Sequence, residues 1–226
     1  MNKSLQILLI VFGVILLLYV IGRITKTIQV YSIPTTSNYP TIRNGSFVVA
    51  TNLVKPERFD FICYNATTPV YGEQIFVHRL CGIENDVLEI KNGDLYVNDK
   101  PVDNNFSLAH IYQVTYPEFD KLEEIEEVDE NFITQESKDS VTLCISDKIV
   151  KSGVVRAKRI DYPADLKNDQ IQMIFSKPWN QDHFGPVKIP KGKYFVLGDN
   201  REFSQDSRYL GFIDESDYVG TVIRKK

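Results

Sequence analysis

The stretch from Asp86 to Val102, DVLEIKNGDLYVNDKPV, carries the clearest secondary-structure pattern in the chain. Apolar and polar residues alternate on both sides of Asn92-Gly93, a dipeptide that favours the tight turn of a β-hairpin. The apolar positions before and after the turn are Val87, Leu88, Ile90, Leu95 and Val97. The pattern therefore predicts two antiparallel strands joined at residues 92 and 93.

Similar short runs lie on both sides of this hairpin. They are rich in Val, Ile, Phe and Tyr and are separated by Pro, Asn, Gly and Thr, as strands and turns are. The runs are IQVYSI (28–33), GSFVVATNL (45–53), DFICYN (60–65), IFVHRLCGI (75–83), KGKYFVLGDN (191–200) and YVGTVIRKK (218–226). Together with an aromatic content of 12%, they predict a mainly β chain.

The composition excludes several classes of protein. With 226 residues, of which 43% are hydrophobic and 25% charged, the chain is neither disordered nor fibrous. A net charge of −4 gives no general reason to bind nucleic acid. Three cysteines without a Cys-x-x-Cys pair argue against a disulfide scaffold and against a zinc site, so we expect no metal and no organic cofactor. Whether Cys63 and Cys81 meet depends on strand register and stays open.

The N-terminus predicts a membrane anchor over residues 1–26. Nineteen residues from Ser4 to Gly22 carry no charge, and as a helix they would rise roughly 28 Å, close to the hydrocarbon thickness of a bilayer. A cleaved signal would have a small-x-small site, and a core helix would have a polar stripe. Neither is present. Lys3 on one side and Arg23 with Lys26 on the other leave the orientation undecided by charge.

An acidic segment interrupts the strand pattern. Ten acidic residues and two lysines lie between Glu118 and Asp139. The apolar residues Phe119, Leu122, Ile125, Val128 and Phe132 recur at helical spacing, which predicts an amphipathic helix. A solvated face is its simplest interpretation, and partner binding is the alternative. We expect the helix to lie in an insertion, 104–175, in a β core made of 27–103 and 176–226.

Three polar segments are candidates for chemistry. The run 33–41, IPTTSNYPT, places hydroxyl side chains between two prolines that hold the chain extended. A strand carries His78, whose unperturbed pKa suits proton transfer at neutral pH. The run 198–208, GDNREFSQDSR, has the density of an internally hydrogen-bonded loop. Each segment alone also fits a purely structural role.

Taken together, these segments resemble the type I signal peptidase family of membrane-anchored serine proteases. The most specific match is IPKGKYFVLGDNR (189–201) followed by Ser204-x-Asp206-Ser207-Arg208-Tyr209-x-Gly211-Phe212. The motif Ser37-x-x-Pro40-Thr41 resembles the nucleophile box of the family. The resemblance covers more than a third of the chain and implies a signal-peptidase-like β ectodomain with an α-containing insertion.

The resemblance also assigns roles. Ser37 matches the nucleophile, Thr35 the hydroxyl that helps bind the oxyanion, and Ser204 the serine that hydrogen-bonds the base. His78 stands where the bacterial branch has lysine, and Asn38 stands where that branch usually has methionine. His-Arg at the base position is found in the endoplasmic-reticulum and archaeal branch. The expected supporting residues of the 198–208 loop are Gly198, Asp199, Asn200, Arg201, Asp206 and Arg208.

The expected function is removal of signal peptides from exported precursors by cleavage after small residues. Substrate would contact Ile33, Pro34, Thr36 and Phe76, and the partners would be precursors and membrane lipid. The catalytic domain would lie on the extracytoplasmic face. The candidates for orienting His78 as base are Ser204 and Asp206. The acid limb of activity is expected at about pH 6–7. The alternative is a catalytically silent or specialised relative that binds exported chains or a partner protein.

Overall fold

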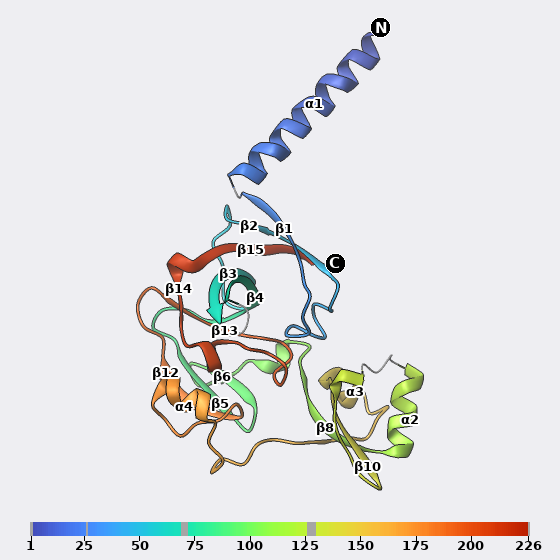
Figure 1. The fold of residues 1–226 in the computed structure, drawn as a ribbon, viewed down its shortest axis with the longest axis vertical. Coiled ribbons are helices and arrows are strands. Elements are labelled where there is room, and N and C mark those ends of the chain that lie inside the picture. The colour runs from blue at the N-terminus through green and yellow to red at the C-terminus, as the bar shows by residue number, and fades with distance from the viewer. Residues whose placement is uncertain (1, 26, 69–71, 126–129, 226) are drawn as a thin grey trace.

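One long apolar helix projects from a mainly β body (Figure 1). The computed structural model describes residues 2–25, 27–68, 72–125 and 130–225. Helix α1 (Lys3–Ile24) has its apolar side chains exposed, and in the described part of the chain it is the one helix long and apolar enough to cross a membrane. The fold class predicted from the sequence, mainly β with an N-terminal apolar helix, is confirmed.

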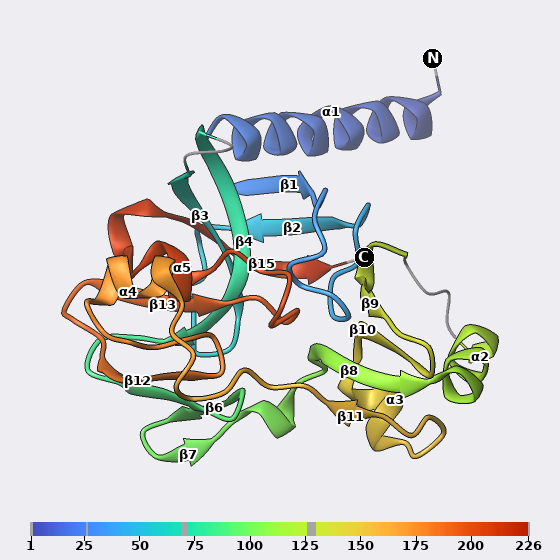
Figure 2. The same ribbon diagram turned by 60° about the horizontal axis from the view of Figure 1, so that its bottom comes forward.

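A seven-stranded sheet forms the centre of the body. Its order is β1-β2-β15-β3-β4-β13-β14, and every described pairing is antiparallel. The strands are β1 (Ile28–Ser32), β2 (Phe47–Thr51), β3 (Phe61–Thr68), β4 (Gly72–Gly82), β13 (Lys193–Leu197), β14 (Ile213–Asp214) and β15 (Tyr218–Lys225). Each of the six runs quoted from the sequence overlaps one of them. Figure 2 shows β1 and β2 nearest α1.

The hairpin predicted at Asn92-Gly93 belongs to a second sheet, of order β12-β5-β6-β7. Its strands are β5 (Val87–Lys91), β6 (Asp94–Val97), β7 (Lys100–Pro101) and β12 (His183–Lys188). Asn92 and Gly93 have φ values of 50° and 75°, as the predicted turn requires. Leu88, Ile90, Leu95 and Val97 all face one core cluster, so the alternation read from the sequence is the packing pattern.

A third sheet, β11-β8-β10-β9, lies at the end of the body away from α1 (Figures 1 and 2). It consists of β8 (Ala109–Thr115), β9 (Ile133–Glu136), β10 (Ser140–Ser146) and β11 (Lys158–Arg159), with helices α2 (Tyr116–Ile125) and α3 (Asp147–Lys151). Helix α4 (Asp169–Phe175) instead packs near α5 (Ser207–Leu210), and its Ile171 enters the core of the hairpin sheet. The division of the chain at residues 104 and 175 stays a prediction.

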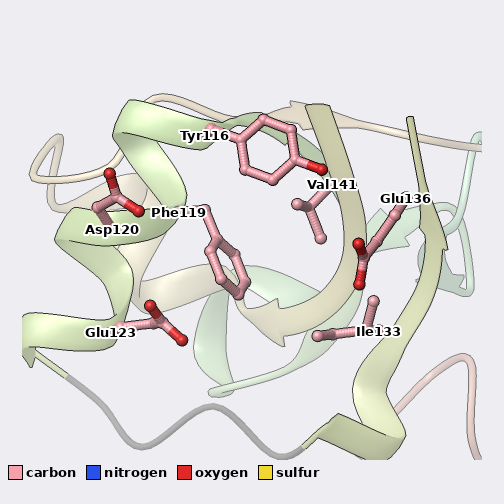
Figure 3. A pocket seen from close by; sticks show the side chains of 7 residues that line it. All are labelled: Tyr116, Phe119, Asp120, Glu123, Ile133, Glu136 and Val141. Carbon is pink, nitrogen blue, oxygen red and sulfur yellow. The ribbon is translucent and has the colours of Figure 1, made fainter. Parts of the chain in front are cut away.

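The acidic helix differs from the prediction. It starts at Tyr116 and ends at Ile125, a 3₁₀ turn covers Glu130–Phe132, and residues 126–129, with Val128, lie outside the described residues. Leu122 is buried, as the helical spacing requires. Between α2 and strands β9 and β10 lies a pocket of ≈ 330 Å³ with Phe119 in its middle (Figure 3). Its lining residues are Tyr116, Phe119, Asp120, Glu123, Ile133, Glu136 and Val141.

Strand β4 brings the candidate residues together. It pairs with β3 from Gly72 to Arg79, whereas β13 pairs with it only from Arg79 to Gly82. Before Arg79, the side of β4 opposite β3 therefore carries no other described strand. The loop 33–42 and the loop 198–208 both reach β4 in this region.

Candidate active site

His78 lies on β4 with its imidazole held between two hydroxyl groups. The residue is 1% exposed, on the sheet face that also carries Tyr64 and Leu80. Its Nδ1 is 2.8 Å from the phenolic oxygen of Tyr64, and its Nε2 is 3.2 Å from Oγ of Ser204. Both ring nitrogens are thus engaged, which fixes the orientation of the ring.

Burial keeps this imidazole neutral. It lowers the pKa of His78 from 6.5 to about 4, because the charged form loses its hydration. The negative charges of Asp206 and Asp199 raise the pKa and the positive charge of Arg208 lowers it, both to a smaller extent. This burial argues against the expected acid limb at about pH 6–7, because the buried imidazole stays neutral to a lower pH. That expectation used the unperturbed pKa of histidine, because the sequence does not show how deeply His78 on β4 is buried.

The loop 33–42 is fastened on two sides around Ser37. The carbonyl oxygen of Ser37 accepts a 3.0 Å hydrogen bond from the backbone N–H of Asn200. The side chain of the next residue, Asn38, is buried and donates a 2.7 Å hydrogen bond to the carbonyl oxygen of Val77. Ser37 itself is half-buried. In the described residues, no hydrogen bond joins its hydroxyl to His78.

The 198–208 loop is held by an internal ion pair. Asp206 accepts two 2.9 Å hydrogen bonds from the guanidinium of Arg208 and one of 3.0 Å from the backbone N–H of Gly198. Arg208 also donates to the carbonyl oxygen of Arg201 at 2.6 Å. Both members of the pair are fully buried, and the positive charge of Arg208 keeps the pKa of Asp206 below its usual range although burial opposes this.

Gly198 is required by close packing at this point. A Cβ on Gly198 would overlap both the hydroxyl of Ser204 and the carbonyl oxygen of Ser37. The absence of a side chain therefore lets the two loops meet beside His78.

Two further buried arginines tie the loop to the rest of the body. Arg79, next to His78, forms two hydrogen bonds of 2.7 and 2.5 Å with Asp199. Arg201 forms two of 2.6 and 2.5 Å with Asp103. Such paired, fork-shaped contacts fix the direction of both partners. These two ion pairs together fix the position of the 198–208 loop, and with it the position of Ser204.

The structure collects most of the residues that the sequence singled out. Ser204 contacts His78 directly. The other members are linked to Ser204 or to β4 through the contacts just described: Ser37, Gly198, Asp199, Asn200, Arg201, Asp206 and Arg208. The ring of Phe76 lies tilted against that of His78, with ring centroids 6.0 Å apart. Pro34 and Thr35 are exposed and Thr36 is half-buried in the same loop as Ser37.

Ile33 differs from its expected role. Its side chain is 4% exposed and packs in a core cluster with Val48 and Phe61. Its N–H and carbonyl oxygen are used by Ser46 and Gly45. Ile33 stands at the start of loop 33–42, and its apolar side chain anchors the loop to the core. The side chain is therefore not available to substrate.

Tyr64 and Asn38 were not recognised as site residues. The alternation in 60–65 places Ile62 and Tyr64 on one face, and the register that pairs Ile62 with His78 brings the phenol to the imidazole. A sequence pattern shows the face but not the register. Asp206, one of the two expected partners of His78, binds Arg208 instead, and Tyr64 occupies Nδ1.

Cys63, Cys81 and Cys144 are buried free thiols, so Cys63 and Cys81 do not form a disulfide. In the described ranges, no group of three or more His, Cys, Asp or Glu residues is arranged to hold a metal ion.

Comparison with known proteins identifies the family. The family model described as signal peptidase, peptidase S26, matches residues 5–224. Signal peptidase I of Bacillus amyloliquefaciens is 29% identical over 196 residues, which are 84% of this chain and 69% of that relative. Signal peptidase IB of Staphylococcus aureus (strain COL) is 29% identical over 214 residues, 91% of this chain and 80% of the relative.

Among solved structures, a signal peptidase I from Enterococcus faecalis V583 matches with 22% identity and a TM-score of 0.35. The match covers 74% of this chain and 97% of that one. The family assignment depends instead on the family model, which spans nearly the whole chain and includes α1, β4 and both loops at His78. The chain belongs to the signal peptidase, peptidase S26, family.

Proposed function

We propose that this protein is a membrane-anchored serine endopeptidase that removes signal peptides from exported precursors, with Ser37 as nucleophile and His78 as general base. The observation that carries the proposal is the 3.2 Å contact between Ser204 and Nε2 of His78. It directs that nitrogen toward the loop that carries Ser37. Two hydrogen bonds hold this loop near His78: one from Asn200 to Ser37, and one from Asn38 to Val77.

In the proposed reaction, the hydroxyl of Ser37 attacks the scissile carbonyl while Nε2 of His78 accepts its proton. The substrate carbonyl oxygen becomes an oxyanion, which the exposed hydroxyl of Thr35 and the backbone N–H of Ser37 would stabilise. His78 then returns the proton to the leaving amine, and water hydrolyses the acyl-enzyme by the same route. The neutral state of His78 at pH 7 meets the first requirement of a base.

The substrate would bind as an extended strand. On the side opposite β3, β4 pairs with no described strand before Arg79, and loop 33–42 contacts this side at Val77. The part of the edge before Val77 can add a strand from another chain. Pro34 and Thr36 of the Ser37 loop, with Phe76 of β4, would form shallow pockets that admit small side chains. Ile33 supports the loop from the core.

Helix α1 would place this site at the membrane surface, with the β body on the extracytoplasmic face. Exported precursors emerge there with their signal segments still in the bilayer. The partners are then the precursor chain and membrane lipid. A single anchor confines the enzyme to the membrane that holds the precursor, which raises the effective concentration of substrate at the site.

A second candidate function is binding without cleavage. It is favoured by one observation: both nitrogens of His78 are engaged, and its pKa of about 4 makes it a weak base. A catalytically silent or specialised relative would use the same open edge of β4 to hold exported chains.

The test is precursor processing by the full-length protein in detergent. We expect cleavage by the wild type, none by Ser37→Ala, and normal cleavage by Ser32→Ala, which changes an exposed serine nearby at the end of β1. Cleavage retained in Ser37→Ala excludes Ser37 as nucleophile. Stable precursor capture by the wild type, with no cleavage, establishes the binding function instead.

A further inference from the structure

Phe132 lies between the two loops that carry Ser37 and Ser204. It is the last residue of the 3₁₀ turn after the acidic helix, and it directly precedes β9 of the third sheet. Its ring centroid is 5.0 Å from that of Tyr39 and 5.6 Å from that of Phe203. Tyr39 follows Ser37 by two residues, and Phe203 directly precedes Ser204. One side chain therefore contacts both loops next to the residues proposed for catalysis.

Phe132 is buried against both loops. Its side chain is 6% exposed and packs in a core cluster with Ala109 of β8 and Cys144 of β10, against the half-buried Tyr39. Phe203 is 37% exposed, and in the described part of the chain its one ring contact is with Phe132. Offset and tilted ring pairs attract one another in preferred geometries. The ring of Phe132 therefore restrains both loops from the third sheet.

The third sheet is fixed to the body independently of this ring. The backbone N–H of Ala109, at the start of β8, donates a hydrogen bond to the carbonyl oxygen of Asp199. The backbone N–H of Arg201 donates to the carbonyl oxygen of Ala109, and both distances are 3.0 Å. Because these bonds do not involve Phe132, its ring can be removed without detaching the sheet from the 198–208 loop.

We propose that Phe132 is a positioning residue that sets how the loop of Ser37 lies relative to that of Ser204. This rests on the proposed function, in which Ser37 is the nucleophile and His78 the base. The 3.0 Å bond from Asn200 to Ser37 joins the two loops at one point. Phe132 contacts each loop at a second point, and a second point limits rotation about the first. Since a small misplacement of a nucleophile relative to its base costs a large factor in rate, the third sheet acts on catalysis without touching the substrate.

The first test is Phe132→Leu in the full-length protein, a change that removes the ring and keeps an apolar side chain. We expect kcat for precursor cleavage to fall about tenfold or more, with KM little changed because the substrate edge of β4 is not altered. The matched control is Phe119→Leu, which removes a ring from another core cluster of the same sheet. It should retain wild-type kcat. Thermal unfolding of both variants shows whether each is folded.

The second test shows whether the ring acts through its two partners. Tyr39→Leu and Phe203→Leu each remove one partner ring, and each should also lower kcat. Combined with either change, Phe132→Leu should lower kcat by a smaller factor than it does alone, because part of its contact has already been lost. The effects of independent residues would multiply instead. A merely structural role of Phe132 predicts a lower thermal midpoint with normal kcat in the folded fraction.

The outcomes separate this inference from the proposed function. Normal kcat in folded Phe132→Leu, or losses that multiply in both combinations, overturns the role of Phe132, while cleavage that Ser37→Ala abolishes leaves the peptidase intact. Failure of the peptidase itself appears as cleavage that survives Ser37→Ala, or as a wild type that binds precursor without cleaving it, and either result also removes the role of Phe132. If Phe132→Leu does not fold, Phe203→Leu decides, because that side chain is partly exposed. Normal kcat in Phe203→Leu then overturns the proposal.

Discussion

The side chain of Asn38 joins the residue after Ser37 to the residue before His78, through its 2.7 Å hydrogen bond to the carbonyl oxygen of Val77. Asn38 is 1% exposed, and its Oδ1 has no hydrogen-bond partner in the described residues. An unpaired buried acceptor costs about 1–3 kcal/mol. The amide of Asn38 therefore contributes more by fixing the spacing between the Ser37 loop and β4 than by stabilising the fold.

Asn38→Leu should slow processing more than it destabilises the fold. It removes the bond to Val77, which lets loop 33–42 move relative to β4, and it also removes the unpaired Oδ1. We expect kcat to fall about tenfold or more because small misplacements of reacting groups are costly, with little change in thermal midpoint. Asn44→Leu, at an exposed position of the same region, is the control. A large loss of stability with normal kcat in the folded fraction would contradict this.

The acid limb of kcat/KM should lie near pH 4. Burial lowers the pKa of His78 to about 4, so the neutral base persists until the pH falls through that value, and protonation below it removes the acceptor for the proton of Ser37. The measurement is processing from pH 3 to 8 with a soluble peptide substrate. Half of the activity lost between pH 6 and 7 would show that His78 titrates as an exposed imidazole.

Thr35→Ser should keep most activity, and Thr35→Val should lose on the order of a hundredfold, because only serine keeps a hydroxyl for the oxyanion. Thr35 is exposed, so neither change should alter stability. Initial rates of precursor cleavage compare the two variants directly. Equal rates would remove Thr35 from the oxyanion site.

Arg208→Met should lower the free energy of unfolding by about 3–5 kcal/mol, because it leaves the carboxylate of Asp206 buried without its partner. The comparison is Lys121→Met, which breaks a surface pair with Glu118 and should lower the free energy of unfolding far less. Denaturant titration of both variants gives the two values. Similar small losses would mean that Asp206 is accommodated without Arg208.

The full-length protein should stay in the membrane pellet after carbonate washing. Helix α1 exposes apolar side chains along its whole length and has no described core to cover them. Release into the supernatant would rule out a spanning anchor. Orientation is then read from protease accessibility of the β body in sealed vesicles.

The sequence by itself determined the elements whose pattern is local. Alternation around Asn92-Gly93, the uncharged run 4–22 and the helical spacing around Leu122 each depend on neighbours within a few residues, and each appears in the structure. Ser37, His78 and the 198–208 loop were found through motif resemblance, which also depends on order along the chain. The spacing predicted an α-helix through Phe132, whereas Glu130–Phe132 form a 3₁₀ turn, because apolar spacing alone does not distinguish the two.

Only the tertiary structure decided how these parts act on one another. The contact of Tyr64 with His78 depends on the β3–β4 register, and that of Asn38 with Val77 joins residues 39 positions apart. The pKa of His78 depends on the total burial produced by β3, β4 and the 198–208 loop. The burial of Ile33 in the core likewise depends on packing against residues distant in sequence, such as Val48 and Phe61. Strand register, burial and electrostatic effects all depend on residues that are distant in sequence. The sequence therefore identifies the chemical groups, but only the tertiary structure shows the environment of each group.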